Sequence, residues 1–186
     1  MKTHISVFLC IILIFGCNGK ENWQSAAFQK FAEKKIILPY SKFQKVKCSL
    51  FEDSLSYKRP IKLVHYINQG GCVGCKISQF VSIEKNSKYD DLFKQIEQIY
   101  IFECKQEETA NIYHELCRLR LGGCVYFDTC QAFITLNPQI QESEIFNTLT
   151  INKNGHVMLI GNPFANIKME KLLNKVLYCE SVNDTI

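Results

Sequence analysis

The feature of this sequence that most constrains its fold is a pair of cysteines separated by two residues, Cys72-Val73-Gly74-Cys75. The apolar run Ile61–Ile67 precedes the pair and predicts a β-strand, and the residues from Lys76 to Ile83 predict a helix. The pair therefore falls on a strand-to-helix turn. Unpaired N–H groups at a helix N-terminus stabilise a thiolate, and the second cysteine lies one turn further on, within reach of a disulfide. The pattern predicts a redox-active dithiol.

The N-terminal segment has the pattern of a targeting signal. Lys2 precedes the apolar run from Ile5 to Phe15, which is too short to span a bilayer as a mature helix. The run ends in Ile14-Phe15-Gly16-Cys17, which resembles the lipobox of bacterial lipoprotein signal peptides, although Phe15 is bulkier than the usual residue. The resemblance implies that residues 1–16 are removed, that Cys17 is lipidated, and that the chain is anchored in the cell envelope, mainly facing the periplasm. An ordinary secretory signal followed by an unrelated cysteine is the alternative.

Length and charge narrow the remaining choices. A chain of 186 residues can bury a substantial core in one domain, and a formal net charge of +4 is too small to indicate a nucleic-acid partner. We expect a tether and N-terminal extension over residues 17–60, one domain over residues 61–180, and a tail over residues 181–186.

Strand and helix patterns alternate along most of the chain. A helix is expected over Glu21–Lys35, and Phe43–Leu55 can carry one or two strands of the extension. The further predicted elements are a helix from Cys72 to Ile83, a short helix at Tyr89–Gln95, a strand at Ile96–Phe102, a helix at Glu107–Leu121, a strand at Cys124–Phe127, a helix at Cys130–Leu136 capped by Asp128, strands at Phe146–Ile151 and His156–Ile160 joined by an Asn-Gly turn, and a helix at Ile167–Leu177. This order predicts an α/β fold with a mixed central sheet and helices on both faces.

Four segments carry a resemblance to a known family: Leu63–Ile67, Cys72-Val73-Gly74-Cys75, Thr148–Val157 and Gly161-Asn162-Pro163. Together they resemble the thioredoxin-like lipoproteins of the bacterial envelope that are related to TlpA-type thiol–disulfide oxidoreductases, over roughly Lys62 to Leu177. The resemblance implies a three-layer thioredoxin-like domain, preceded here by the short extension. It also implies a membrane-anchored oxidoreductase that acts on protein or small-molecule thiols and disulfides, without a cofactor.

The same resemblance assigns roles to individual residues. Cys72 would be the attacking thiol and Cys75 the resolving one. His65 lies near the position where many relatives carry a buried acid, so a role in proton transfer is implied for it. The alternative is a strand histidine that points away from the site, and strand alternation leaves both open.

Two departures from the family pattern concern substrate handling. Relatives usually carry a cis-proline before the first hairpin strand, where this chain has Phe146 and Asn147, and its nearest proline is Pro138. We therefore expect a substrate loop of different shape at Phe146–Asn147. Directly before the cysteine pair, Gly70-Gly71 replaces the aromatic residue that is usual there.

The sequence is compatible with two other functions. Cys72 and Cys75 with a histidine make a plausible soft-metal site, for which His156 after the hairpin turn is the histidine considered. A zinc site built from Cys104, Cys117, Cys124 and Cys130 lacks a second C-x-x-C spacing. A thioredoxin-like fold can also serve as a non-catalytic binding module, because fold alone does not decide function.

The remaining cysteines have no spacing that dictates their pairing: Cys48, Cys104, Cys117, Cys124, Cys130 and Cys179. Cys124 and Cys130 can close a small loop as a disulfide. The alternative is that Cys117 and Cys124 are buried as small apolar residues, as many thiols are.

Overall fold

The computed structural model describes residues 29, 31, 34–46, 59–68, 70 and 72–183. Gln29 and Phe31 are helical, but most of the helix expected over Glu21–Lys35 lies outside the described residues. The proposed lipidation site Cys17 and the cysteine Cys48 lie outside them as well. Within the described residues, no helix is both long and apolar enough to cross a membrane.

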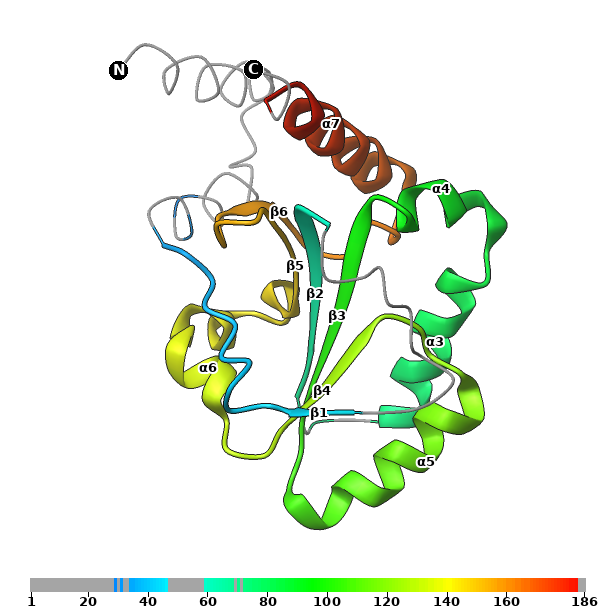
Figure 1. Cartoon of the computed structure of the whole chain (residues 1–186), viewed down its shortest axis with the longest axis vertical. Helices are drawn as coiled ribbons and strands as arrows, with labels where there is room; N and C mark the ends of the chain where they lie inside the picture. The colour runs from blue at the N-terminus through cyan, green and yellow to red at the C-terminus, as the bar shows by residue number, and fades with distance from the viewer. Residues whose placement is uncertain are drawn as a thin grey trace.

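Strands and helices alternate through the described chain (Figure 1). The strands are β1 (Gln44–Lys45), β2 (Ile61–Ile67), β3 (Ile96–Glu103), β4 (Cys124–Asp128), β5 (Thr148–Ile151) and β6 (Val157–Ile160). The α-helices are α3 (Val73–Glu84), α4 (Asp90–Phe93), α5 (Thr109–Leu119), α6 (Ala132–Leu136) and α7 (Ile167–Asn183). Short 3-10 helices cover Ser87–Tyr89, Gln106–Glu108, Pro138–Glu142 and Glu144–Asn147.

The six strands form one mixed sheet in the order β1-β4-β3-β2-β5-β6. Strands β2, β3 and β4 are parallel, while β5 and β6 form an antiparallel hairpin that pairs with β2 through β5. The two-residue strand β1 adds an antiparallel edge to β4, so the N-terminal extension joins the same sheet. The mixed sheet confirms the predicted fold class.

The crossovers decide which helices share a face of the sheet. From β2 to β3 and from β3 to β4 the chain steps in the same direction, so two right-handed crossovers place α3 and α5 on one face. Helix α7 packs on that face too, against Ile61 and Leu63. Helix α6 and the segment 34–46 cover the opposite face (Figure 1). The three layers predicted from the sequence are therefore present.

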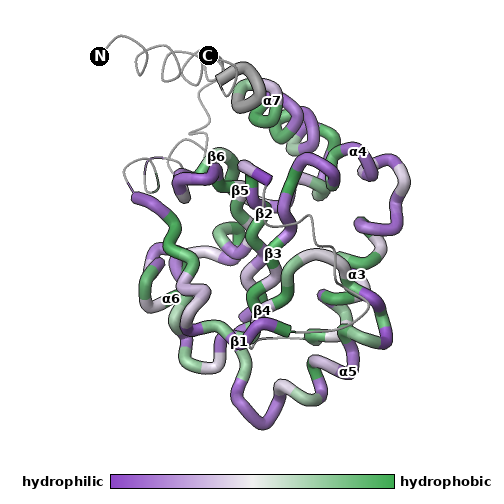
Figure 2. The backbone as a smooth tube through the Cα atoms, in the orientation of Figure 1, coloured by the Kyte–Doolittle hydropathy of each residue, from purple (hydrophilic) through white to green (hydrophobic). Residues whose placement is uncertain are grey.

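The core lies on both faces of the sheet. Hydrophobic residues recur along the central strands, while hydrophilic and hydrophobic residues alternate along the helices (Figure 2). On the α6 face, Phe31, Ile36 and Phe43 from the N-terminal extension are buried against the sheet. Burial of such side chains stabilises a domain by about 1.5–3 kcal/mol each, so the extension contributes to the core.

Helix α6 and strand β5 each begin two residues later than the sequence predicts. Helix α6 starts at Ala132 rather than Cys130, because the Asp128 carboxylate accepts hydrogen bonds from the backbone N–H groups of Ala132 and Phe133, each at 2.8 Å. Strand β5 starts at Thr148, and the predicted strand residues Phe146 and Asn147 belong to a 3-10 helix instead. Hydrophobic alternation cannot distinguish these residues from a strand, because a short 3-10 turn also buries single side chains.

The Asn-Gly turn forms as predicted and holds the N-terminal segment. The Asn152 side-chain oxygen accepts hydrogen bonds from the backbone N–H groups of Asn154 and His156, both at 3.0 Å. Gly155 has a φ of 83°, and its carbonyl accepts a hydrogen bond from the Ile36 N–H at 2.8 Å. The segment that enters the domain is thus fastened at the hairpin turn.

Candidate active site

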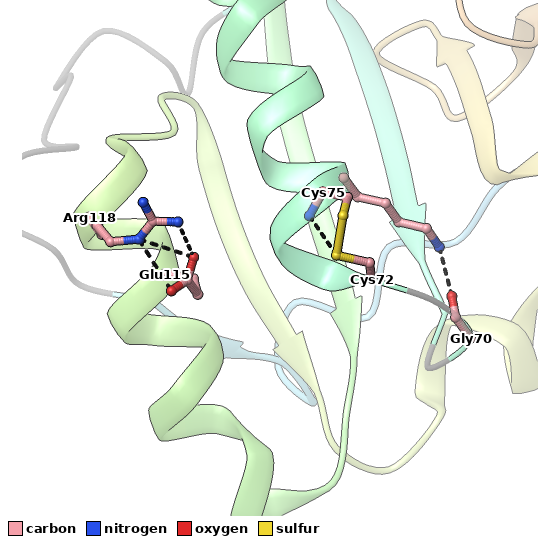
Figure 3. The surroundings of a disulfide bond; sticks show 6 residues. Gly70, Cys72, Cys75, Glu115 and Arg118 are labelled. Carbon is pink, nitrogen blue, oxygen red and sulfur yellow. Dashed lines mark hydrogen bonds and ion pairs between the residues drawn. A yellow bond between two sulfur atoms is a disulfide. The ribbon is translucent and has the colours of Figure 1, made fainter.

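Cys72 and Cys75 form a disulfide at the start of α3 (Figure 3). Cys72 is the N-cap residue, with extended backbone, and Cys75 lies in the first turn, with the two Cα atoms 5.2 Å apart. The Cys72 Sγ accepts a hydrogen bond from the Cys75 backbone N–H at 3.2 Å. Both residues are exposed. The predicted strand-to-helix placement is confirmed, and the disulfide is open to attack by a partner's thiolate.

The loop before the disulfide is held to α3 by Lys76. Its ammonium donates hydrogen bonds to the Gly70 carbonyl at 3.1 Å and to the Asn68 side-chain oxygen at 3.3 Å. The contact with Gly70 is drawn in Figure 3. These hydrogen bonds position Gly70, which lies next to the place where related proteins usually carry an aromatic residue. They also place the positive charge of Lys76 on the helix that begins at the disulfide.

On the other side of the disulfide, α5 contributes an ion pair (Figure 3). The Arg118 guanidinium donates to the Glu115 carboxylate, with Nη2 and Oε2 2.6 Å apart. The same Oε2 lies 3.5 Å from the position that a Cβ would take at Gly74, between the two cysteines. Sequence reasoning missed this pair, because spacing within α5 does not say which residue of α3 it approaches.

His65 faces α3, whereas strand alternation alone left open whether its side chain points towards or away from the disulfide's side of the sheet. It is 2 % exposed, its ring lies 4.7 Å from the Phe80 ring and 5.0 Å from the Tyr100 ring, and its Nδ1 is 3.3 Å from the Thr148 hydroxyl. Burial lowers the pKa of His65 to about 3, so the ring is neutral near pH 7. Its contact on α3 is Phe80, about two turns beyond the disulfide, and its role in proton transfer stays a prediction.

A half-buried polar link, absent from the sequence predictions, ties the far end of α3 to the loop after α5. The Tyr100 hydroxyl donates to Glu84 Oε1 at 2.9 Å, and Glu84 Oε2 accepts from the Gly122 N–H at 2.8 Å. Burial is the main cause that raises the pKa of Glu84 above its ordinary value. A helix-end glutamate looks solvated in the sequence, and nothing there distinguishes Glu84 from its exposed neighbours.

The predicted substrate-loop residues lie just before β5. Because Thr148 pairs with His65 near the carboxyl end of β2, Asn147 and Phe146 lie at the end of the sheet from which the chain leaves for the disulfide. Phe146 is buried and packs edge-on against Phe31, with ring centroids 5.0 Å apart, whereas Asn147 is half-buried. Asn147 is therefore the more accessible of the two, and their role in binding substrate stays a prediction.

The metal alternative with His156 is wrong on geometric grounds. Ile151 pairs with Lys62, so the turn that precedes His156 lies beyond the amino end of β2, whereas Cys72 follows its carboxyl end. At about 3.3 Å per residue the length of β2 separates the two, far beyond any metal–ligand distance. Among the residues described, no three or more histidine, cysteine or acidic side chains gather as a metal site requires, so the zinc set is not assembled either.

The other described cysteines differ in their surroundings. Cys130 and Cys179 are exposed and Cys104 is buried, and none of these three is in a disulfide, so the predicted option of a Cys124–Cys130 bond is wrong. Cys124 is buried, and its thiol lies 3.7 Å from the Glu97 carboxylate. Burial raises the pKa of Cys104 to about 11. These surroundings differ from those of the exposed Cys72–Cys75 disulfide.

Comparisons with known proteins give structural likenesses only. No protein-family model and no curated protein matches the chain. A candidate thiol:disulfide interchange protein DsbE from Chlorobium tepidum aligns with a TM-score of 0.44 and 16 % identity, over 63 % of this chain and 79 % of that one. A thioredoxin-like protein from Porphyromonas gingivalis aligns with a TM-score of 0.44 and 8 % identity, over 72 % and 85 %. AhpC of Mycobacterium tuberculosis aligns with a TM-score of 0.38 and 13 % identity, over 67 % and 76 %.

The assignment of the fold rests on the topology of the chain itself. Strand β2 lies in the centre of the sheet, and α3, which begins at the cysteine pair, follows it in the chain. The antiparallel hairpin β5–β6 and helix α7 complete the domain. The fold is thioredoxin-like.

Proposed function

We propose that this protein is a thiol–disulfide oxidoreductase of the TlpA-like kind, held to the membrane through a lipid on Cys17 and facing the periplasm. The observation that carries the proposal is the exposed Cys72–Cys75 disulfide, in which Cys72 caps α3. Its substrates are disulfides or thiols of proteins or small molecules. The lipidation and the location rest on the sequence pattern around Cys17, which lies outside the described residues.

The reaction balances without a cofactor. In the reductive direction the Cys72 thiolate attacks one sulfur of a substrate disulfide, the substrate S–S bond breaks, and one substrate sulfur leaves as a thiolate. The Cys75 thiolate then attacks the Cys72 sulfur, which restores the Cys72–Cys75 disulfide and releases the second substrate thiolate. Two electrons pass from the dithiol to the substrate, and the two protons of the dithiol end on the released thiols. The oxidative direction is the reverse.

The position of Cys72 suits it to be the attacking thiol. The first backbone N–H groups of a helix have no partner within the helix and stabilise a negative charge at the N-cap. The Cys75 N–H already points at the Cys72 sulfur in the disulfide. Once the disulfide is reduced, the same N–H can stabilise the Cys72 thiolate, which is the reactive form.

Trapping with glutathione disulfide tests the proposed activity. In a Cys75→Ser variant, Cys72 should hold glutathione as a stable mixed disulfide, detected by mass spectrometry of the intact protein and of the Cys72 peptide. A Cys72→Ser, Cys75→Ser variant should form no adduct at this site. Cys130 is an exposed thiol elsewhere, so a Cys75→Ser, Cys130→Ser variant should trap glutathione on Cys72 as Cys75→Ser alone does. Absence of an adduct on Cys72 would rule out the activity.

Metabolic labelling tests the anchor. Cells grown with labelled palmitate should incorporate label into the wild-type protein but not into Cys17→Ser, and the variant should move from the membrane to the soluble fraction, since acyl chains supply the attachment. An unlabelled wild-type protein would exclude lipidation and leave the thiol chemistry untouched.

A further inference from the structure

The α5 ion pair and the first turn of α3 meet at Gly74. Because Gly74 has no side chain, the Glu115 carboxylate lies beside the backbone of the turn that Cys72 caps, with Oε2 3.5 Å from where a Cβ would be. Figure 3 shows Glu115 and Arg118 on α5 facing the disulfide. Helix α3 has no acidic residue in its own first turn, so Glu115 brings to this helix end a negative charge from a neighbouring element.

Two negative charges would compete for the same helix end. The N-terminus of a helix stabilises one anion through its unpaired N–H groups and its dipole. When Cys72 and Cys75 are reduced, a Cys72 thiolate would carry a charge of the same sign as Glu115, and like charges disfavour each other's ionisation. Arg118 offsets this repulsion, because its guanidinium contacts the carboxylate through Nε and Nη2.

We infer that Glu115 and Arg118 act as a pair of positioning residues that set how readily Cys72 ionises, and thereby the redox balance of the Cys72–Cys75 couple. The inference deepens the proposed oxidoreductase function and rests on it for its biological meaning. The Glu115 charge opposes the Cys72 thiolate, and the Arg118 charge supports it. The pair contributes little to folding stability, because both side chains are partly exposed, at 35 % and 55 %.

Other charges near the disulfide do not substitute for this pair. Lys76 is positive, but its ammonium is directed to the Gly70 carbonyl and the Asn68 side chain. His114 precedes Glu115 on α5 and interacts electrostatically with it, in the sense that lowers the pKa of Glu115. Arg118 is the largest cause of the lowered pKa of Glu115, so the carboxylate is ionised near pH 7.

The test compares variants that remove one charge at a time. In a Cys75→Ser background, the pH dependence of Cys72 alkylation by iodoacetamide, followed on the Cys72 peptide, gives the pKa of that thiol without any exchange reaction. Glu115→Gln should lower this pKa and raise the thiolate fraction about threefold near neutral pH. Arg118→Gln should raise the pKa and lower the thiolate fraction about threefold. Salt at about 1 M should shrink both shifts, because these charges are partly exposed.

Asp91 and Lys94 provide a matched control. They form an exposed ion pair of the same i,i+3 spacing, 2.8 Å apart, next to β3 at the amino end of the sheet, away from the disulfide. Asp91→Asn and Lys94→Gln should leave the Cys72 pKa unchanged. Glu115→Ala should repeat the shift of Glu115→Gln, which separates the lost charge from any effect of the new amide.

The outcomes separate the inference from the proposed function. Shifts of opposite sign in the two α5 variants, with silent controls, support the inference. Unchanged alkylation in either variant, or shifts of the same sign in both, overturns it. If the wild-type couple exchanges no disulfide with glutathione, the proposed function fails, while the alkylation result still decides the effect of the two charges.

Discussion

The rings of His65 and Tyr100 stack beneath α3, with centroids 5.0 Å apart and planes inclined by 11°. The two residues are paired across β2 and β3, and Phe80 of α3 closes the third side at 4.7 Å from the imidazole. The helix that carries the disulfide is thus supported by an aromatic layer with a neutral histidine in it. Charging that histidine would require an ion inside the layer.

We predict that His65 makes the fold sensitive to acid. Its pKa is lowered in the folded protein to about 3, so below pH 6.5 the unfolded chain binds a proton that the folded chain does not. The contribution of His65 to the free energy of unfolding is therefore fully present above pH 6.5. The free energy of unfolding decreases as the pH falls from 6.5 towards 3, by up to about 1.4 kcal/mol per pH unit. Urea unfolding at several pH values measures it.

His65→Phe is the comparison for this prediction, because it keeps an aromatic ring and removes the titrating group. Its stability should fall less steeply than that of the wild type over the same pH range. Glu84 acts in the opposite sense, because its pKa is raised by folding and acid favours its folded form, but it is present in both proteins. Equal slopes in the two proteins would contradict the buried neutral histidine.

We expect Glu84→Ala to destabilise the domain by about 1–3 kcal/mol, because it leaves the Gly122 N–H without its acceptor. The Tyr100 hydroxyl loses Glu84 but keeps the Gln98 side-chain oxygen, 2.6 Å away. Tyr100→Phe should cost less, since it removes the donor while keeping the ring. Denaturant unfolding of the two single variants and the double variant gives the coupling energy. Strictly additive effects would show that the Tyr100–Glu84 hydrogen bond contributes nothing to stability.

Much of the fold could be predicted because its elements have clear periodicities. The apolar run Ile61–Ile67 is buried except for the half-buried Lys62, as a central strand requires, and the Asn-Gly turn forms the hairpin expected of it. The pairing of β1 with β4 could not be predicted, because Gln44 and Lys45 are too few for a recognisable alternation. The start of β5 was misplaced, because Phe146 is as buried as a strand residue.

The candidate site was predictable in part, since the position of Cys72 and Cys75 follows from local sequence alone. Its surroundings depend on contacts between distant segments. His156 and the disulfide lie at opposite ends of the sheet because of the β2–β5 register, and Glu115 reaches Gly74 because of the way α5 crosses α3. Neither the β2–β5 register nor the packing of α5 on α3 can be predicted from the spacing of residues in the sequence.

Gly155→Ala should loosen the N-terminal segment. Gly155 has a φ of 83°, and a Cβ there would lie 2.7 Å from the Ile36 carbonyl oxygen, so the variant has both a strained backbone and a clash. We expect a loss of roughly 1–3 kcal/mol and faster tryptic cleavage at the exposed Lys34 and Lys35. Gly70→Ala, where the nearest atom to a Cβ is 3.8 Å away, is the control. Equal cleavage rates in the two variants would argue against the docking of this segment on the turn.

The reduction potential of the Cys72–Cys75 couple decides whether this disulfide has a redox role. Equilibration of the purified protein in glutathione buffers, with both redox forms resolved by alkylation and mass spectrometry, measures it. We predict reversible exchange, with a potential in the range of roughly −120 to −270 mV that catalytic dithiols span. A couple that does not exchange, or a potential below about −300 mV, as structural disulfides typically have, would contradict a redox role for this site.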